Sequence, residues 1–241
     1  MILAGPGTGK TQLLSLRAAN ILKKTDLYPG NILILTYTNA GVKSMRERLA
    51  EIIGSDGYDI VVETFHSFSN HLITDSEEAA SVKGDRVEMT ALERIQLLEY
   101  LLDHLDGMKP IRHPNAPYLY RRDIESDISA LKRDGITPED FEGFLKNFEP
   151  NGVLIEKKHL PRLKAMSKLY SAYEEAKTPQ GNLAVFDIRG RYDFDDMILL
   201  ATEALQRESD LLAKYQEQFQ YVMVDEFQDT NGSQLKLLQT L

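Results

Sequence analysis

The chain has 241 residues and a mass of 27.3 kDa, enough for one large domain or two small ones with a substantial core. Its hydrophobic content of 42% and charged content of 27% are ordinary for a globular protein. It has no cysteine, which excludes disulfides and thiolate metal sites and fits a reducing cytoplasm, where we expect it to act. No apolar run approaches the roughly 20 residues of a membrane helix, and we expect no signal peptide, because the first motif begins at residue 4.

The formal net charge of −9 argues mildly against a nucleic-acid partner, because phosphate binding depends on Lys and Arg. The net charge does not exclude a protein that holds a single nucleic-acid strand. Such a protein needs local basic and aromatic residues in a narrow groove, not a basic surface as a whole.

A glycine-rich segment opens the chain: residues 4–11 read Ala-Gly-Pro-Gly-Thr-Gly-Lys-Thr. It fits the phosphate-binding loop, except that Ala4 replaces the usual first glycine. Glycines let the backbone bring N–H groups to an oxyanion, and the helix expected at residues 11–24 adds the positive end of its dipole. Lys10 can then reach the β- and γ-phosphates, and the Thr11 hydroxyl can bind Mg²⁺. The predicted phosphate-binding residues are Ala4, Gly5, Pro6, Gly7, Thr8, Gly9, Lys10 and Thr11.

The alternative is a glycine-rich turn that binds nothing, and a second motif argues against it. The apolar run at 221–224 predicts a short strand buried on both faces of a parallel sheet. Such a strand delivers the following carboxylates to the edge where open α/β sheets bind ligands. Asp225 would hold the metal, and Glu226 would orient or deprotonate the attacking water.

Residues 225–231, Asp-Glu-Phe-Gln-Asp-Thr-Asn, resemble the metal-site motif of the UvrD/Rep-type superfamily 1 DNA helicases, for which this string is close to diagnostic. Three further segments match the family in the same order: Thr-Tyr-Thr-Asn-Ala at 36–40, Thr-Phe-His-Ser-Phe at 64–68, and Tyr-Asp-Phe-Asp-Asp at 192–196. The resemblance implies ATP and Mg²⁺ as cofactors, with Glu226, Lys10 and Gln228 as catalytic residues. It also implies contacts with single-stranded DNA from Thr36, Tyr37, Asn39, Thr64, His66 and Tyr192.

Several of these residues have structural alternatives. Thr38 or Asn39 could simply cap the helix expected up to Ile53, and many relatives carry Lys-Ala-Ala where this chain has Ala-Gly-Val at 40–42. A lone histidine such as His66 after a strand is more often structural. Asp193 is expected to cap the helical stretch from 195 to 218, so the acids around it are interpreted as structural.

Strands are predicted at 32–37 and, followed by a loop, at 60–68, whereas helical signals dominate from about residue 72 to 180. These signals include capped helix starts at Thr90 and Thr137 and helices at 121–133 and 160–177, whose charged residues are interpreted as solvated faces. Residues 183–188 could add a short strand. The predicted fold is therefore an α/β, RecA-like P-loop sheet formed by 1–71 and 186–241, with an all-helical subdomain inserted at 72–185.

The resemblance implies the N-terminal, ATP-binding portion of a 3′–5′ helicase that couples Mg-ATP hydrolysis to movement on single-stranded DNA. Repair, recombination and plasmid replication are all open to such a protein. Relatives add an adenine-recognising glutamine segment, a Gly-Asp-x-x-Gln-Ser segment and a second RecA-like domain, none of which these residues contain. The rival interpretation is therefore a non-catalytic nucleotide- or DNA-binding fragment. The sheet is also expected to be incomplete, with a vacancy between residues 1–3 and the 221–224 strand.

Overall fold

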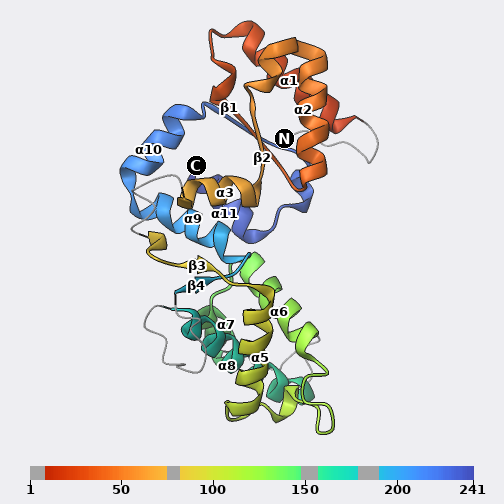
Figure 1. Cartoon of the computed structure of the whole chain (residues 1–241), viewed down its shortest axis with the longest axis vertical. Helices are drawn as coiled ribbons and strands as arrows, with labels where there is room; N and C mark the ends of the chain where they lie inside the picture. The colour runs from red at the N-terminus through yellow and green to blue at the C-terminus, as the bar shows by residue number, and fades with distance from the viewer. Residues whose placement is uncertain (1–8, 75–81, 148–156, 179–189) are drawn as a thin grey trace. The chain divides into compact units, whose positions relative to one another are not determined.

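The computed structural model describes residues 9–74, 82–147, 157–178 and 190–241, and the chain divides into two compact units (Figure 1). The first unit comprises Met1–Lys83 and Met197–Leu241, and the second comprises Gly84–Asp196. None of the helices in these described ranges is long and apolar enough to cross a membrane.

The first unit is built on a parallel sheet of three strands in the order β2 (Val61–Thr64), β1 (Ile32–Thr36), β5 (Tyr221–Val224). In the central strand, Ile34 pairs with Val62 on one side and with Met223 on the other. The chain is therefore an α/β protein with a parallel sheet, as predicted.

Helices α1 (Lys10–Lys24) and α2 (Asn39–Ile53) lie on one side of this sheet, and α10 (Ser209–Gln218) and α11 (Gly232–Thr240) lie on the other (Figure 1). Alternate residues of β1 point to opposite faces, and every one of them is buried. The core on the side of α1 and α2 consists of Ala18, Ile21, Ile32, Ile34, Met45, Leu49, Ile60 and Val62. Short 3₁₀ segments, η1 (Pro29–Asn31), η2 (Gly54–Tyr58) and η5 (Phe227–Asp229), and α9 (Asp196–Arg207) complete the unit.

The expectation that the 221–224 strand is buried on both faces is wrong. Tyr221 and Val222 are 36% and 39% exposed, whereas β1 is completely covered. The difference follows from pairing: within the described ranges, β1 has a neighbour on each side and β5 pairs with β1 alone. The predicted first strand at residues 1–3 lies outside the described residues, as does the possible strand at 183–188.

The segment after β2 also differs from its prediction. A loop was expected up to residue 68, but α3 (Phe65–Thr74) begins directly after the strand. The Thr64 hydroxyl accepts a hydrogen bond from the Ser67 N–H at 3.1 Å, which satisfies one of the free donors of the first turn. Phe65 and Phe68 are buried.

The second unit consists of helices α5 (Ala91–His104), α6 (Arg121–Arg133), α7 (Pro138–Lys146) and α8 (Leu160–Lys177), with η3 (Lys109–Ile111) and η4 (Lys157–His159). The predicted capped helix starts are confirmed, and both are capping boxes: Thr90 pairs with Glu93, and Thr137 pairs with Asp140. Two strands that were not predicted, β3 (Val87–Glu88) and β4 (Arg191–Tyr192), pair in parallel. Strands of two residues are too short to carry a periodic signal.

Candidate functional site

The carboxyl edge of the parallel sheet carries the candidate site. Strand β5 ends at Val224, and the Asp225 N–H continues the ladder by donating to the Leu35 carbonyl at 2.9 Å. The helix α1 begins at Lys10, directly after Gly9, whose φ of +85° is a left-handed conformation that favours glycine. The end of β5 and the start of α1 lie next to each other, although more than two hundred residues separate them in the sequence.

Two side-chain contacts join these elements. The Thr11 hydroxyl donates a hydrogen bond to Asp225 Oδ2 at 3.1 Å, and Lys10 Nζ lies 3.5 Å from Glu226 Oε2. The Lys10 and Glu226 side chains are 21% and 40% exposed, so both remain accessible from solvent. The structure thus brings together four of the predicted site residues. The predicted loop residues Ala4, Gly5, Pro6, Gly7 and Thr8 lie outside the described residues.

The donor set fits a magnesium ion. Mg²⁺ prefers oxygen ligands, and adjacent ligands of an octahedron with bonds of about 2.0–2.1 Å lie about 2.9 Å apart. The Thr11 and Asp225 oxygens, 3.1 Å apart, already have nearly this separation. These two oxygens can therefore serve as neighbouring ligands with little rearrangement.

Glu226 has an unusual backbone. Its φ of 53° and ψ of 44° make it the one non-glycine residue with positive φ in the described part of the chain. A left-handed conformation costs a residue with a Cβ about 1–2 kcal/mol, and such residues cluster at functional sites. The Glu226 N–H donates to Asp225 Oδ1 at 3.1 Å, which helps to hold this turn.

The Glu226 carboxylate is held ionised. Gln228 Nε2 donates a hydrogen bond to Glu226 Oε2, and this bond, helped by the positive charge of Lys10 against a small effect of burial, lowers the pKa of Glu226. Gln228 therefore belongs structurally to the same group as Lys10 and Glu226. The family resemblance had already placed Gln228 among the catalytic residues, but the sequence pattern gave no hydrogen-bond partner for it.

The predicted DNA-contacting residues separate into two groups. Thr36 and Thr64 end their strands at this same edge of the sheet, but their side chains are buried and their hydroxyls donate to the Thr38 carbonyl and to Ser67 Oγ. Tyr37 is 51% exposed, and Asn39 is exposed at the first residue of α2. Thr38 is the N-cap, since its hydroxyl accepts from the Gly41 N–H, so the Asn39 side chain is not needed for capping.

His66 and Tyr192 are less open. His66 lies in the first turn of α3 and is half-buried. Tyr192 belongs to β4 of the second unit and is 5% exposed, so its ring presents little surface to a nucleic-acid base. The geometry therefore supports Tyr37 and Asn39 more strongly than Tyr192.

A cluster of buried charges in the second unit was missed. Lys132 and Lys177, interpreted as solvated, have side chains only 1% and 4% exposed. Lys132 Nζ lies 2.6 and 2.7 Å from the two Asp193 oxygens, and Lys177 Nζ lies 2.7 Å from Asp196 and 2.9 Å from Glu174. We call these five residues the buried charge cluster. The sequence held a partial signal, because Lys132 lies on the same face of α6 as the apolar Ile124 and Ile128, but spacing does not decide whether a lysine turns inward.

The cluster confirms the structural reading of the acids. Asp193 Oδ1 accepts hydrogen bonds from the N–H groups of Asp195 and Asp196 at 3.1 Å, as expected of a helix cap. Burial alone would raise the pKa of Asp193, but Lys177 and Lys132 outweigh it and hold the pKa well below its usual value. The three carboxylates of the cluster face these two ammonium groups, which fill the position that a cation would need.

These features define an α/β protein with a parallel sheet and a polar site at its carboxyl edge. The model of the UvrD/REP helicase N-terminal domain matches residues 1–241, the whole chain. The chain belongs to the UvrD/REP helicase family.

Curated relatives carry the name ATP-dependent DNA helicase PcrA. The chain is 31% identical over 244 residues to that of Leuconostoc citreum, and 27% identical over 241 residues to that of Bacillus subtilis (strain 168). Each match covers 100% of this chain but only 28% and 29% of the relative. The chain thus spans less than a third of the length of these helicases.

Proposed function

We propose that the chain is the ATP-binding part of an ATP-dependent DNA helicase that moves 3′ to 5′ on single-stranded DNA. The observation that carries the proposal is the meeting of Lys10 and Thr11 with Asp225 and Glu226 at the carboxyl edge of the sheet. Family membership and the name of the relatives support the same function.

Each residue then has a role. The loop at residues 4–11 would cradle the phosphates with its N–H groups, and Lys10 would reach the β- and γ-phosphates. Thr11 and Asp225 would hold Mg²⁺, which when bound neutralises charge on the phosphate oxygens. Because the pKa of Glu226 is lowered, it is a weak base at neutral pH, which favours a role in orienting the attacking water with Gln228 fixing its carboxylate.

The same sheet edge would couple nucleotide to DNA. Tyr37 and Asn39 follow β1, which is hydrogen-bonded to β5, the strand that directly precedes Asp225. Thr36, Thr64 and His66 would support this loop or contact the DNA backbone from the neighbouring strand ends. In this proposal residues 1–71 and 186–241 form a RecA-like P-loop domain and residues 72–185 an inserted helical subdomain. A further strand would cover the second edge of β5, where Val222 is exposed.

A second candidate concerns the 241-residue polypeptide assayed by itself. These residues contain no Gly-Asp-x-x-Gln-Ser segment, and arginines supplied from a second RecA-like domain would be absent from such an assay. Positive charge around the γ-phosphate contributes several orders of magnitude to phosphoryl transfer. We therefore expect this polypeptide to bind nucleotide but to hydrolyse ATP negligibly, with or without single-stranded DNA. Turnover near the usual 1–100 s⁻¹ of phosphoryl-transfer enzymes would contradict this.

The test of the nucleotide site is a titration with a fluorescent ATP analogue in the presence of Mg²⁺. A hydrogen bond to a charged group contributes about 1.5–3 kcal/mol, so Lys10→Ala should weaken binding by roughly tenfold or more. Lys24→Ala, which removes an exposed lysine in the last turn of the same helix, is the matched control and should leave the affinity unchanged. Equal affinities for all three proteins would overturn the assignment.

A further inference from the structure

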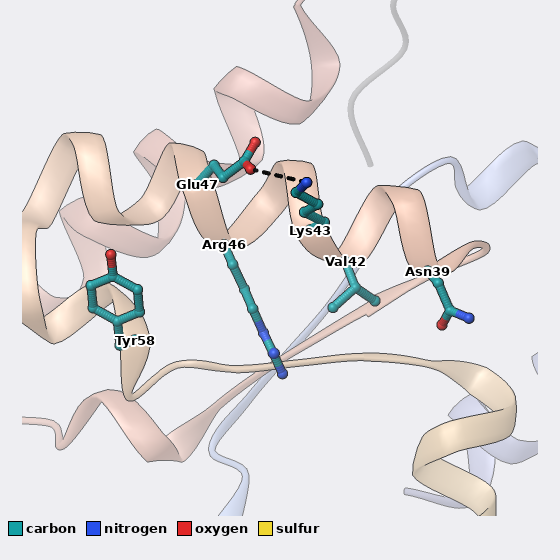
Figure 2. Close-up of a pocket in the computed structure, with 6 residues that line it drawn as sticks. All are labelled: Asn39, Val42, Lys43, Arg46, Glu47 and Tyr58. Atoms are coloured by element: carbon teal, nitrogen blue, oxygen red, sulfur yellow. Dashed lines mark ion pairs between the residues drawn. The ribbon is translucent and has the colours of Figure 1, made fainter.

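A pocket with a volume of about 360 Å³ lies along α2, apart from the site at Lys10 and Asp225. Its lining residues are Asn39, Val42, Lys43, Arg46, Glu47 and Tyr58 (Figure 2). The first five fall at positions i, i+3, i+4, i+7 and i+8 of the helix, which is one continuous face. Tyr58 comes from the last residue of η2 and closes one end of the pocket.

The position of Tyr58 is built into the fold. A Cβ on the preceding residue, Gly57, would lie 2.7 Å from the Leu49 carbonyl carbon and 2.8 Å from the Ala50 nitrogen. Only glycine therefore allows η2 to approach the backbone of α2 so closely. This approach brings Tyr58 beside the helix, yet the residue is 74% exposed and adds nothing to the core.

Two cations face the pocket. Arg46 Nη2 donates a hydrogen bond to the Val62 carbonyl of β2 at 3.0 Å, which fixes the guanidinium, and a guanidinium has several further N–H donors. Lys43 Nζ lies 4.0 Å from Glu47 Oε1, and their side chains are 81% and 62% exposed. An ion pair this long and this exposed contributes little, so an anion can displace it.

We propose that this pocket binds one nucleotide of a single-stranded nucleic acid, with its phosphate between Lys43 and Arg46 and its base against Tyr58. A cationic groove combined with an exposed ring is the usual means of holding a single strand, since every base has a face that can stack. The inference rests on the proposed function, because Asn39 belongs both to the proposed DNA-contacting loop and to the pocket wall.

An acidic peptide is the competing occupant. It would pair with Lys43 and Arg46, but it would gain nothing from the Tyr58 ring that Gly57 positions. The two occupants therefore differ in how strongly they depend on the aromatic residue. Substitution of Tyr58 can therefore distinguish the two occupants.

The experiment measures the fluorescence anisotropy of a labelled 12-residue oligothymidylate with the whole chain, in the absence of ATP and at several salt concentrations. Tyr58→Ala should weaken binding roughly 5- to 100-fold without changing the salt dependence. Lys43→Ala should reduce the slope of log K against log salt by about 0.7, the value for one phosphate contact on a single strand. The matched controls Tyr28→Ala and Lys24→Ala, both at exposed residues, should stay within twofold of the wild type.

Three results would overturn the proposal: no binding by the wild type, an equal effect of Tyr58→Ala and Tyr28→Ala, or displacement by polyglutamate as effective as by unlabelled oligothymidylate. The last result would identify an acidic peptide as the better occupant. Both substituted side chains are exposed, and unchanged circular dichroism would establish that the variants are folded. Because ATP is absent from this assay, failure here is distinct from failure of the Lys10 titration.

Discussion

Replacing Lys132 with methionine tests the buried charge cluster. Lys132 is 1% exposed and lies within ion-pair distance of Asp193, Asp196 and Glu174. The cluster has two lysines and three carboxylates, a formal charge of 2 − 3 = −1, and the substitution changes it to 1 − 3 = −2. Three carboxylates would then share a single buried cation.

Breaking a buried ion pair by removing one partner costs about 3–5 kcal/mol, because the remaining charge stays buried without compensation. Burial already raises the pKa of Glu174, so this group can take up a proton and keep the cost near the lower limit. For a unit of about a hundred residues, a loss of about 3 kcal/mol corresponds to a fall in Tm of more than about 10 °C. Methionine has a similar length and is apolar, so the loss reflects charge and not an empty cavity.

The assay is urea-induced unfolding of the whole chain at pH 7, followed by circular dichroism at 222 nm. Lys146→Met is the matched control, because Lys146 pairs with Glu142 at 2.9 Å on the surface and its side chain is 68% exposed. Its loss should cost less than about 0.5 kcal/mol. Adding Asp193→Asn to Lys132→Met should recover part of the lost stability, since it removes one unpaired charge. If Lys132→Met were within about 1 kcal/mol of Lys146→Met, the cluster would not be the stabilising feature described here.

Three other results are expected. The pKa of Asp193 is lowered, so its contribution to stability is present above about pH 4 and is lost as the pH falls below that value. The pKa of Lys177 is raised, so its contribution is present below about pH 10 and is lost as the pH rises above that value. An increase in the urea midpoint below about pH 4 would contradict this. Gly57→Ala should lower the free energy of unfolding in urea by about 1–3 kcal/mol, because its Cβ would meet backbone atoms. Gly143→Ala is the control, since a Cβ there has open space in α7, and it should be neutral or stabilising by up to about 1 kcal/mol. Glu226→Gly should not lower the midpoint, because glycine relieves the left-handed backbone; a loss above about 1 kcal/mol would show that the side chain stabilises the fold.

Much of the fold could be predicted because it depends on local patterns. The strand β1, the capped helix starts at Thr90 and Thr137, and the helix at 160–177 follow from spacing and hydrogen-bonding chemistry that act within a few residues. The order of the strands is not local. It fixes which strand is covered on both sides, so the exposure of Val222 could not be read from the apolar run at 221–224, and an open side of this strand was expected only from the family resemblance.

The candidate site at the sheet edge and the buried charge cluster also differ in how far they could be predicted from the sequence. Lys10, Thr11, Asp225 and Glu226 were predicted to converge because parallel strands present their carboxyl ends at one edge, and the structure brings them within hydrogen-bonding or ion-pair distance. The buried charge cluster could not be predicted in this way. A lysine on an amphipathic helix can reach solvent or turn inward, and only the position of Asp193 from a distant segment decides between them.

The most direct test of the central claim compares nucleotide affinity with and without a divalent metal. Because Asp225 is proposed to hold the metal, Asp225→Asn should weaken binding of a non-hydrolysable ATP analogue at least tenfold with Mg²⁺ but by less than twofold with EDTA. Asp229→Asn, an exposed carboxylate in η5, is the control and should change neither affinity. Lys10→Ala should weaken binding in both conditions, because its proposed contact is with phosphate and not with the metal. An equal loss for Asp225→Asn with and without metal, or no loss, would contradict a shared Mg-nucleotide site.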